Sequence, residues 1–373
     1  MSEISSIFDL LKSQNGTLIS FYARPRSFTS GGVSTTINTW MEAFSEFGLK
    51  NLVQAYMHKG LSPIGQLATK VPIKHFLTHR VFSIPTSFRF LKKEVVLVYL
   101  HEGWTLSNFM MATYCFIHKI PYAIMPHGVY ESEIVRTLKC LRFRMVLENF
   151  VLRHSKFVHL FFDGEKEEVW KICRDVKIVV APTVLRPIEK FDKSWIGDGN
   201  YFLYAGRIDP THKGLDLLIE CWKLAGRSEK LLLAGPDFNG GAQVIQNLIS
   251  QFNLQDNVLL LGNLDFDNLT LIMRHAKGFL HISRWESYGR SAIDSIRMGI
   301  PTLISNRMQI SNVKPISNIA YITSLEKEDI ISGINFIGNL EAEHHKIIHE
   351  LHFEAFSNYF NTRKVISSLV SQV

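Results

Sequence analysis

Hydrophobic and polar positions along this chain follow two alternating patterns. Short apolar runs rich in β-branched and aromatic residues recur throughout, and each is followed by a turn signal or by a stretch with helical spacing, such as residues 214–226. This succession is typical of α/β proteins with parallel sheets. The runs predict strands at 17–22, 51–56, 94–100, 122–126, 157–162 and 177–182 in the first half, and at 201–206, 230–235, 257–262, 278–283 and 301–305 in the second.

The two sets of strands are separated by residues 183–199, where Pro187 and two glycines interrupt the periodicity. Such a segment is typical of an interdomain linker. We therefore expect an N-terminal domain over 1–185 and a C-terminal domain over 190–355, each a Rossmann-like, doubly wound sheet, facing each other across a cleft. Because ligands of such sheets bind outside the carboxyl ends of the strands, the residues that follow the strands are the functional candidates.

Composition narrows the class of protein. A chain of 373 residues with 46% hydrophobic residues is globular rather than disordered. Its four cysteines form no CxxC pair, which disfavours a zinc site or a disulfide framework and favours a reducing compartment. The first residues lack the apolar core of a secretory signal, and no apolar run approaches the ~20 residues of a membrane span. We expect a cytoplasmic protein whose contact with a membrane, if any, is peripheral.

Positive charge is concentrated in the first half. Residues 1–190 carry 24 Lys and Arg against 15 Asp and Glu, and part of the excess lies in 131–157, where basic and apolar residues alternate at helical spacing. A basic helix of this kind can rest on anionic lipid or bind an acidic acceptor, or it is simply a solvated surface. Zinc fingers, RNP-like aromatic pairs and basic tails are absent from the sequence, which disfavours nucleic acid as a partner.

The first candidate site is the segment GRIDPTHKG at 206–214, which follows a predicted strand and opens a helix. Gly206 allows the chain to turn, and Arg207 and Lys213 bring two positive charges to the carboxyl end of the strand. The planar fork of an arginine and the mobile charge of a lysine suit a diphosphate group without a metal ion. The alternative is a solvated turn before a surface helix.

The second candidate site is WESYGRSAID at 285–294, which follows the predicted strand 278–283. A helix is expected to begin between Ser287 and Arg290, and the free amide groups of its first turn can bind anions or hydroxyl oxygens. Glu286 lies before this helix and Asp294 one to two turns into it, so two carboxylate acceptors can reach different hydroxyl pairs of one elongated ligand. Alternatively, both are ordinary acids near a helix N-terminus.

The order of these motifs resembles a known family. The sequence has GR-x5-KG, then AGP at 234–236, then E-x7-D, then GIPTLIS at 299–305. Over 201–305 this is similar to the nucleotide-sugar half of retaining glycosyltransferases of the GT-B fold, family four. The N-terminal half resembles it more loosely, through Gly31-Gly32, Pro126-His127-Gly128 and the strand-end segment His101-Glu102-Gly103-Trp104. The resemblance also implies a C-terminal helix, 356–373, that packs back on the N-terminal domain.

The resemblance implies a role for each candidate residue. Arg207 and Lys213 would hold the donor diphosphate and stabilise its charge as the glycosidic bond breaks. Glu286 would accept hydrogen bonds from hydroxyls of the donor sugar, and Asp294, which replaces the second glutamate of the family, would hold the ribose. The remaining expected contacts are His127 to the primary hydroxyl of the sugar, Gly31 and Gly32 near the diphosphate, and the amides of Ser287, Tyr288, Gly289 and Arg290 to the sugar or the phosphates.

The implied function is transfer of a hexose from a nucleotide sugar, such as UDP-glucose, to a glycan or a lipid-linked sugar in polysaccharide or glycoconjugate biosynthesis. The anomeric configuration would be retained, and neither a metal nor another cofactor is expected. Two alternatives remain: a catalytically silent GT-B subunit that supports a partner transferase at the membrane, and a GT-B epimerase or phosphorylase. A nicotinamide dehydrogenase is disfavoured, because GxGxxG does not follow the first predicted strand.

Overall fold

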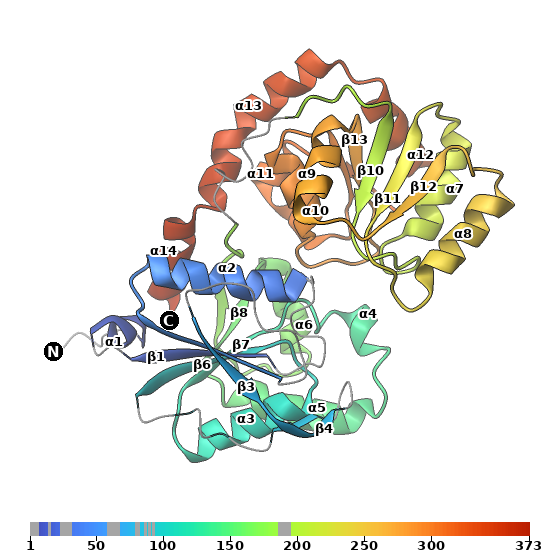
Figure 1. Cartoon of the computed structure of the whole chain (residues 1–373). Coiled ribbons are helices and arrows are strands. Elements are labelled where there is room, and N and C mark those ends of the chain that lie inside the picture. The colour runs from blue at the N-terminus through green and yellow to red at the C-terminus, as the bar shows by residue number, and fades with distance from the viewer. Residues whose placement is uncertain are drawn as a thin grey trace. The chain divides into compact units, whose positions relative to one another are not determined.

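The computed structural model describes residues 7–13, 16–22, 32–57, 68–78, 83–85, 88, 91, 94–185 and 195–373. The chain divides into two compact units, one formed by Met1–Arg186 with Tyr359–Val373 and the other by Pro187–Asn358 (Figure 1). The division after Arg186 lies beside the expected boundary at 185. The segment that returns to the first unit begins at Tyr359 rather than at 356.

The first unit is built on a seven-stranded parallel sheet with the strand order β3-β2-β1-β6-β7-β8-β9. Each strand predicted for this half is present, and β3, which contains Pro72 and lies at the edge of the sheet, was not predicted. A short antiparallel pair, β4 (His75–Thr78) and β5 (Ser83–Pro85), lies outside the sheet. The strands of the sheet are β1 (Thr17–Tyr22), β2 (Asn51–Met57), β3 (Thr69–Ile73), β6 (Val95–His101), β7 (Tyr122–Met125), β8 (Phe157–Leu160) and β9 (Ile178–Val180).

Helices cover both faces of this sheet (Figure 1). The long helix α2 lies on one face, where it packs against α14, and α3 packs against α5 on the other. The basic segment 131–157, expected as one helix, is instead α4 and α5, because the backbone turns through a left-handed residue at Cys140 (φ 55°). The helices of the unit are α1 (Ile7–Ser13), α2 (Gly32–Glu46), α3 (Leu106–Ile117), α4 (Ser132–Val135), α5 (Leu141–Arg153), η1 (Asp163–Glu165), α6 (Lys166–Trp170) and α14 (Thr362–Gln372).

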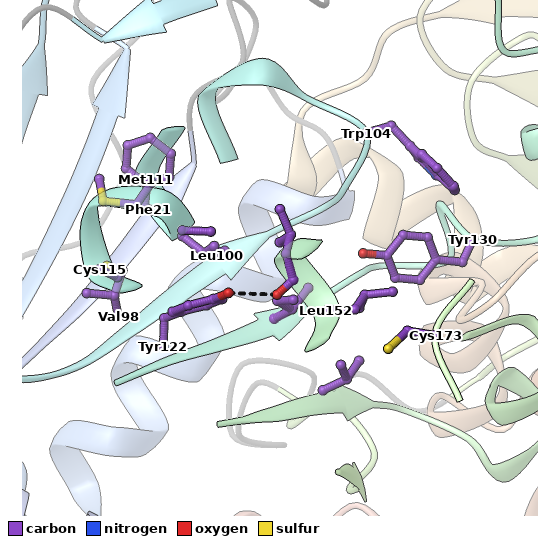
Figure 2. Close-up of a cluster of buried hydrophobic side chains, with 14 of the residues drawn as sticks. Phe21, Val98, Leu100, Trp104, Met111, Cys115, Tyr122, Tyr130, Leu152 and Cys173 are labelled. Atoms are coloured by element: carbon purple, nitrogen blue, oxygen red, sulfur yellow. Dashed lines mark hydrogen bonds between the residues drawn. The ribbon is translucent and has the colours of Figure 1, made fainter. Parts of the chain in front are cut away.

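The core beneath α3 and α5 fixes the carboxyl ends of β6 and β7. Side chains from the central strands, such as Leu100, pack with Met111 of α3 and Leu152 of α5, all with less than 1% of their surface exposed (Figure 2). The hydroxyl of Tyr122 donates to the carbonyl of Val151 at 2.8 Å, so the polar end of this buried ring is satisfied. The strand ends therefore have little freedom to move, which suits a site built on them.

The second unit has a six-stranded parallel sheet with the order β12-β11-β10-β13-β14-β15. Its predicted strands are present, and the edge strand β15 was not predicted. The strands are β10 (Tyr201–Ala205), β11 (Lys230–Ala234), β12 (Val258–Gly262), β13 (Gly278–His281), β14 (Thr302–Ser305) and β15 (Tyr321–Thr323). The helices are α7 (Leu215–Ala225), α8 (Gly241–Gln251), α9 (Phe266–His275), α10 (Arg290–Arg297), η3 (Gln309–Asn312), α11 (Lys314–Ser317), α12 (Lys327–Gly338) and α13 (Ala342–Tyr359).

The C-terminal segment differs from the single helix expected at 356–373. Helix α13 ends at Tyr359 and α14 begins at Thr362, because the side chain of Asn361 accepts a hydrogen bond from the amide of Lys364 at 3.1 Å and caps a new helix. At the other end of α14, the side-chain amide of Gln372 pairs with both backbone groups of Val180, at 3.1 and 3.0 Å. The last helix thereby pairs with one residue of the open edge of β9.

Candidate active site

Both sheets reverse their strand order at a defined place. In the second unit the reversal lies between β10 and β13, and in the first unit it lies between β1 and β6. Crevices outside the carboxyl ends of such strands are the usual ligand sites of doubly wound sheets. The segment 206–214 follows β10, and the segment 285–294 lies between β13 and β14, so both candidate segments lie at the reversal of the second unit.

The loop after β10 is shaped by a glycine at its end. Gly214 has φ 66°, and a Cβ there would lie 2.4 Å from the carbonyl oxygen of Ile282. Only glycine allows the start of α7 to approach the end of β13 this closely without displacing the backbone. Lys213, the preceding residue, is therefore held next to the loop that carries Glu286.

Lys213 and Glu286 form an ion pair, in which Nζ of the lysine donates to Oε2 of the glutamate. The two side chains are only 9% and 18% exposed. Burial opposes the negative charge of Glu286, but Lys213 and a nearby ring, His281, outweigh it and hold the pKa of Glu286 well below its usual value. Two predicted ligand-binding groups are thus brought together, and each neutralises the other.

Arg207 is exposed and lies over the ring of Phe238, with 4.4 Å between the guanidinium carbon and the ring centroid. Its Nη2 lies 3.4 Å from Nδ1 of His212. His212 stacks on Trp285 with 4.7 Å between the centroids, and its Nε2 donates to the carbonyl of Trp285 at 2.9 Å. These contacts join the two candidate loops. The sequence analysis missed His212 and Trp285, whose only signal was their place inside the two motifs.

Helix α10 begins at Arg290, so Ser287 and Tyr288 belong to the loop before it and are buried. Gly289 caps the helix with φ 57°, and a Cβ there would lie 2.4 Å from Cε of Met308. The hydroxyl of Ser291 donates to the carbonyl of Ala205, the last residue of β10, at 2.7 Å. The first turn of α10 is therefore held against the end of β10. The contacts of the segment 287–290 with a ligand stay a prediction.

Asp294 has a structural partner in the same helix. Its Oδ1 lies 3.7 Å from Nη1 of Arg297, whose side chain is 4% exposed. Burial lowers the pKa of Arg297, and the charge of Asp294 opposes that shift. The aspartate therefore helps to compensate a buried positive charge. Its predicted contact with a ribose stays a prediction.

In the first unit, His127 follows β7 in a left-handed conformation with φ 56°. Its Nε2 lies 3.0 Å from Nδ1 of His101, the last residue of β6. Gly32 is the first residue of α2, and a Cβ there would meet no atom of the described residues within 4 Å. Gly31 lies outside the described residues.

A buried carboxylate supports the loop after β6. Glu148 accepts hydrogen bonds from the hydroxyl of Tyr130 at 2.5 Å and from the amide of Trp104 at 2.8 Å. Burial raises the pKa of Glu148 to about 7, although these hydrogen bonds favour its charged form. Trp104 is itself left-handed (φ 62°), so the carboxylate stabilises a strained backbone at the strand end.

Among the residues that the structure describes, no group of three or more His, Cys, Asp and Glu side chains is placed to hold a metal ion. The same part of the chain contains no helix that is long and apolar enough to span a membrane.

Residues 186–350 match the family model described as glycosyl transferases group 1. A GDP-mannose:cellobiosyl-diphosphopolyprenol alpha-mannosyltransferase of Xanthomonas oryzae pv. oryzae is 28% identical over 201 residues, which are 51% of this chain and 50% of that protein. The chain thus matches about half the length of this curated relative.

Solved structures are similar over nearly the whole chain. Sucrose-phosphate synthase from Thermosynechococcus elongatus has a TM-score of 0.73 at 15% identity, with 94% of this chain and 96% of that one covered. Anabaena Alr3699/HepE, in a complex with UDP and glucose, has a TM-score of 0.73 at 13% identity, with 96% and 100% covered. The architecture is therefore GT-B, with two Rossmann-like α/β units. The second unit, which carries Arg207, Lys213 and Glu286, is the part that matches the glycosyltransferase family model.

Proposed function

We propose that this protein is a retaining glycosyltransferase of family four that transfers a hexose from a nucleotide sugar to a sugar hydroxyl. The observation that carries this proposal is the arrangement of Arg207, Lys213 and Glu286 at the strand reversal of the second unit, within the segment that matches the family model. Two cations and a carboxylate at this edge suit a ligand that has a diphosphate at one end and hydroxyl groups beside it.

The proposed chemistry uses these groups without a metal. The bond between the anomeric carbon and the diphosphate oxygen breaks, and the diphosphate leaves with the electron pair. Arg207 and Lys213 stabilise the charge that develops on it. The acceptor hydroxyl attacks from the face that the diphosphate leaves, and its proton passes to the departing phosphate oxygen, so the configuration is retained.

Glu286 would bind hydroxyls of the transferred sugar. Lys213 has three N–H donors, so it can donate to a phosphate oxygen and remain beside Glu286. The low pKa of Glu286 keeps it ionised and acceptor-only at neutral pH, as a group that receives hydrogen bonds from a diol must be. Asp294 would serve the ribose, His127 the primary hydroxyl of the sugar, and the segments at 31–32 and 287–290 the diphosphate or the sugar.

The donor is the part of the proposal that is easiest to test. The similar HepE structure contains UDP and glucose, whereas the name of the Xanthomonas relative specifies GDP-mannose. We propose UDP-glucose and would measure melting temperatures with UDP-glucose, GDP-mannose and ADP-glucose. A ligand at 100 times its dissociation constant stabilises a protein by roughly 2.7 kcal/mol. A lack of any shift with all three would contradict the proposal, and binding without transfer would favour the silent-subunit or the epimerase alternative.

For the acceptor we propose a glycan or a lipid-linked sugar, with peripheral contact of the first unit with an anionic membrane from the cytoplasmic side. Helix α5 exposes 62% of Phe143 and 69% of Val146, and the exposed Arg142 comes directly before Phe143 in the same helix. Exposed apolar side chains beside basic ones are typical of surfaces that bind anionic lipid.

Co-sedimentation with vesicles tests this contact. Phe143→Asp should reduce binding to vesicles that contain phosphatidylglycerol, whereas Val244→Asp, a change at an exposed apolar residue of α8 in the second unit, should not. Equal binding by both variants and the wild type would remove α5 from the membrane proposal.

A further inference from the structure

Three polar side chains of the first unit form a continuous chain of hydrogen bonds. Ser20 lies in β1, His101 ends β6, and His127 follows β7, and these strands are neighbours in the sheet. The hydroxyl of Ser20 lies 2.8 Å from Nε2 of His101, and Nδ1 of His101 lies 3.0 Å from Nε2 of His127. Ser20 and His101 are each 2% exposed, and only His127, at the outer end, is half-buried.

Both imidazole rings are neutral at physiological pH. Burial lowers the pKa of His101 to about 3, with a contribution from His159, and burial together with His101 lowers the pKa of His127 well below its usual value. A neutral imidazole has one N–H donor and one acceptor nitrogen. In the contact between the two rings, one ring must therefore donate and the other must accept. Once the donor of one hydrogen bond in this series is known, the positions of the other protons follow.

Ser20 determines that direction. Among the described residues its hydroxyl has no hydrogen-bond partner besides His101. If it accepted from His101, its own proton would be buried with no acceptor among the described residues, at a cost of about 1–3 kcal/mol. The hydroxyl therefore donates to Nε2 of His101, which places the proton of that ring on Nδ1. His101 then donates to Nε2 of His127, whose own proton must be on Nδ1.

Contacts with neighbouring residues hold the hydrogen-bonded side chains of Ser20, His101 and His127 in place. The side-chain amide of Asn108 donates to the carbonyls of His101 and Glu102, at 3.1 and 3.2 Å, and so fixes the backbone at the end of β6. The ring of His127 contacts Phe161 edge to face, with 5.6 Å between centroids. A third ring, His159, does not take part, because its Nε2 donates to the carbonyl of Ala181 at 2.9 Å.

We infer that Ser20 and His101 are positioning residues that hold His127 in the tautomer protonated on Nδ1, so that His127 presents a hydrogen-bond donor to a substrate oxygen. The identity of that oxygen as a hydroxyl of the donor sugar rests on the proposed function, whereas the tautomer does not. A donor at this position favours ligands with an acceptor oxygen there and disfavours ligands with an ammonium group.

Long-range ¹H–¹⁵N correlation spectra of the full chain, labelled at histidine, test the tautomer without any substrate. The wild type should show His127 protonated on Nδ1 and unprotonated on Nε2, with the signals assigned through His127→Gln. Protonation of His127 on Nε2 would overturn the inference.

Two variants of His101 separate positioning from space filling. The amide of an asparagine reaches about as far as Nδ1 of a histidine, and that of a glutamine about as far as Nε2. His101→Asn can still donate to His127 and should preserve the Nδ1–H signal of His127. His101→Gln can keep the hydrogen bond with Ser20 but loses the donor to His127, so His127 should become a mixture of the two tautomers. If the better-filling glutamine preserves the tautomer and asparagine does not, His101 has only a packing role.

Turnover provides the second readout. With UDP-glucose as donor, His101→Gln should lower kcat roughly tenfold with less than threefold change in KM, and His101→Asn should stay within about threefold of the wild type. If the spectra show the Nδ1–H tautomer of His127 but the protein does not use a nucleotide sugar, this inference stands and the proposed function is refuted. Equal kcat for both variants would overturn the positioning role.

Discussion

Lys213 and Glu286 lie 73 positions apart in the sequence, and they form an ion pair between the loops that follow β10 and β13. Both side chains are largely buried, so each charge depends on the other for compensation. Replacement of either residue should therefore change the stability of the second unit as well as its affinity for a ligand.

Lys213→Ala should weaken binding of the free nucleoside diphosphate by about 1.5–3 kcal/mol, because a charge-assisted contact is lost. It should also lower the free energy of unfolding by roughly 3 kcal/mol, because the carboxylate of Glu286 stays buried without its counter-charge. Calorimetric titration with UDP and urea unfolding measure the two effects. The double variant Lys213→Met/Glu286→Gln is the control and should recover much of the stability but not the affinity. Wild-type stability in Lys213→Ala would contradict the coupling.

Acid should remove the stabilisation that Glu286 provides. Its pKa in the folded protein is well below the value of about 4.3 that a glutamate has in an unfolded chain. The contribution is therefore fully present above about pH 4.3 and is lost as the pH falls through the folded-state pKa. Urea unfolding of the wild type and Glu286→Gln at several pH values should give a constant gap between pH 6 and 8 and a smaller one toward pH 3. If the difference in free energy of unfolding between the wild type and Glu286→Gln increases in acid, Glu286 is not the group with the lowered pKa.

The two carboxylates of E-x7-D should differ in their kinetic effects. If Glu286 binds the transferred sugar as proposed, Glu286→Gln should lower kcat more than it lowers UDP affinity, because it would weaken hydrogen bonds that strengthen as the anomeric carbon becomes electron-poor. Asp294→Asn should raise KM by a factor of roughly 10 with less effect on kcat. Both constants and UDP binding should be measured for both variants. Loss of UDP binding in Glu286→Gln alone would invert the assignment.

Asp294→Asn should also reduce stability, because the buried guanidinium of Arg297 loses part of its compensation. We expect a decrease in the free energy of unfolding of about 1–3 kcal/mol. Addition of Arg297→Met to Asp294→Asn provides the control and should restore part of it. If Asp294→Asn is as stable as the wild type, the ion pair with Arg297 contributes nothing measurable.

If the proposed function holds, transfer should survive EDTA, because Arg207 and Lys213 would supply the positive charge that a metal ion supplies in metal-dependent glycosyltransferases. Product formation with and without chelator measures this directly. Activity that disappears with EDTA and returns with manganese would place the diphosphate at a different site.

The alternating pattern of the sequence was sufficient to predict both sheets, since central parallel strands are buried on both faces and appear as apolar runs. Strands β3 and β15 were missed because neither is a continuous apolar run: β3 contains Lys70 and Pro72, and β15 has only three residues and ends in a threonine. The break at Asn361 did have a signal, because asparagine is a preferred residue before a helix.

The candidate site was predictable only as a set of residues. Strand-end motifs selected Lys213, Glu286 and His127, but contacts such as the Lys213–Glu286 pair depend on which strands are neighbours, and strand order is not part of a local pattern. The link from His127 to His101 depends further on a left-handed backbone at a residue that is not glycine. Such strained conformations are imposed by tertiary packing, so residue type alone does not reveal them.

The pairing of Gln372 with Val180 has a consequence for how the chain is made. The second unit is one contiguous stretch of the sequence, whereas the first is assembled from two stretches, one before and one after it in the sequence. A ribosome that adds about 5–20 residues per second needs roughly 10–40 s to complete the 192 positions between Val180 and Gln372. During that interval the edge of β9 has no cover from α14 and can pair with other strands. Synthesis thus starts the first unit before the second and finishes it after the second, so the edge of β9 stays uncovered until α14 has been made.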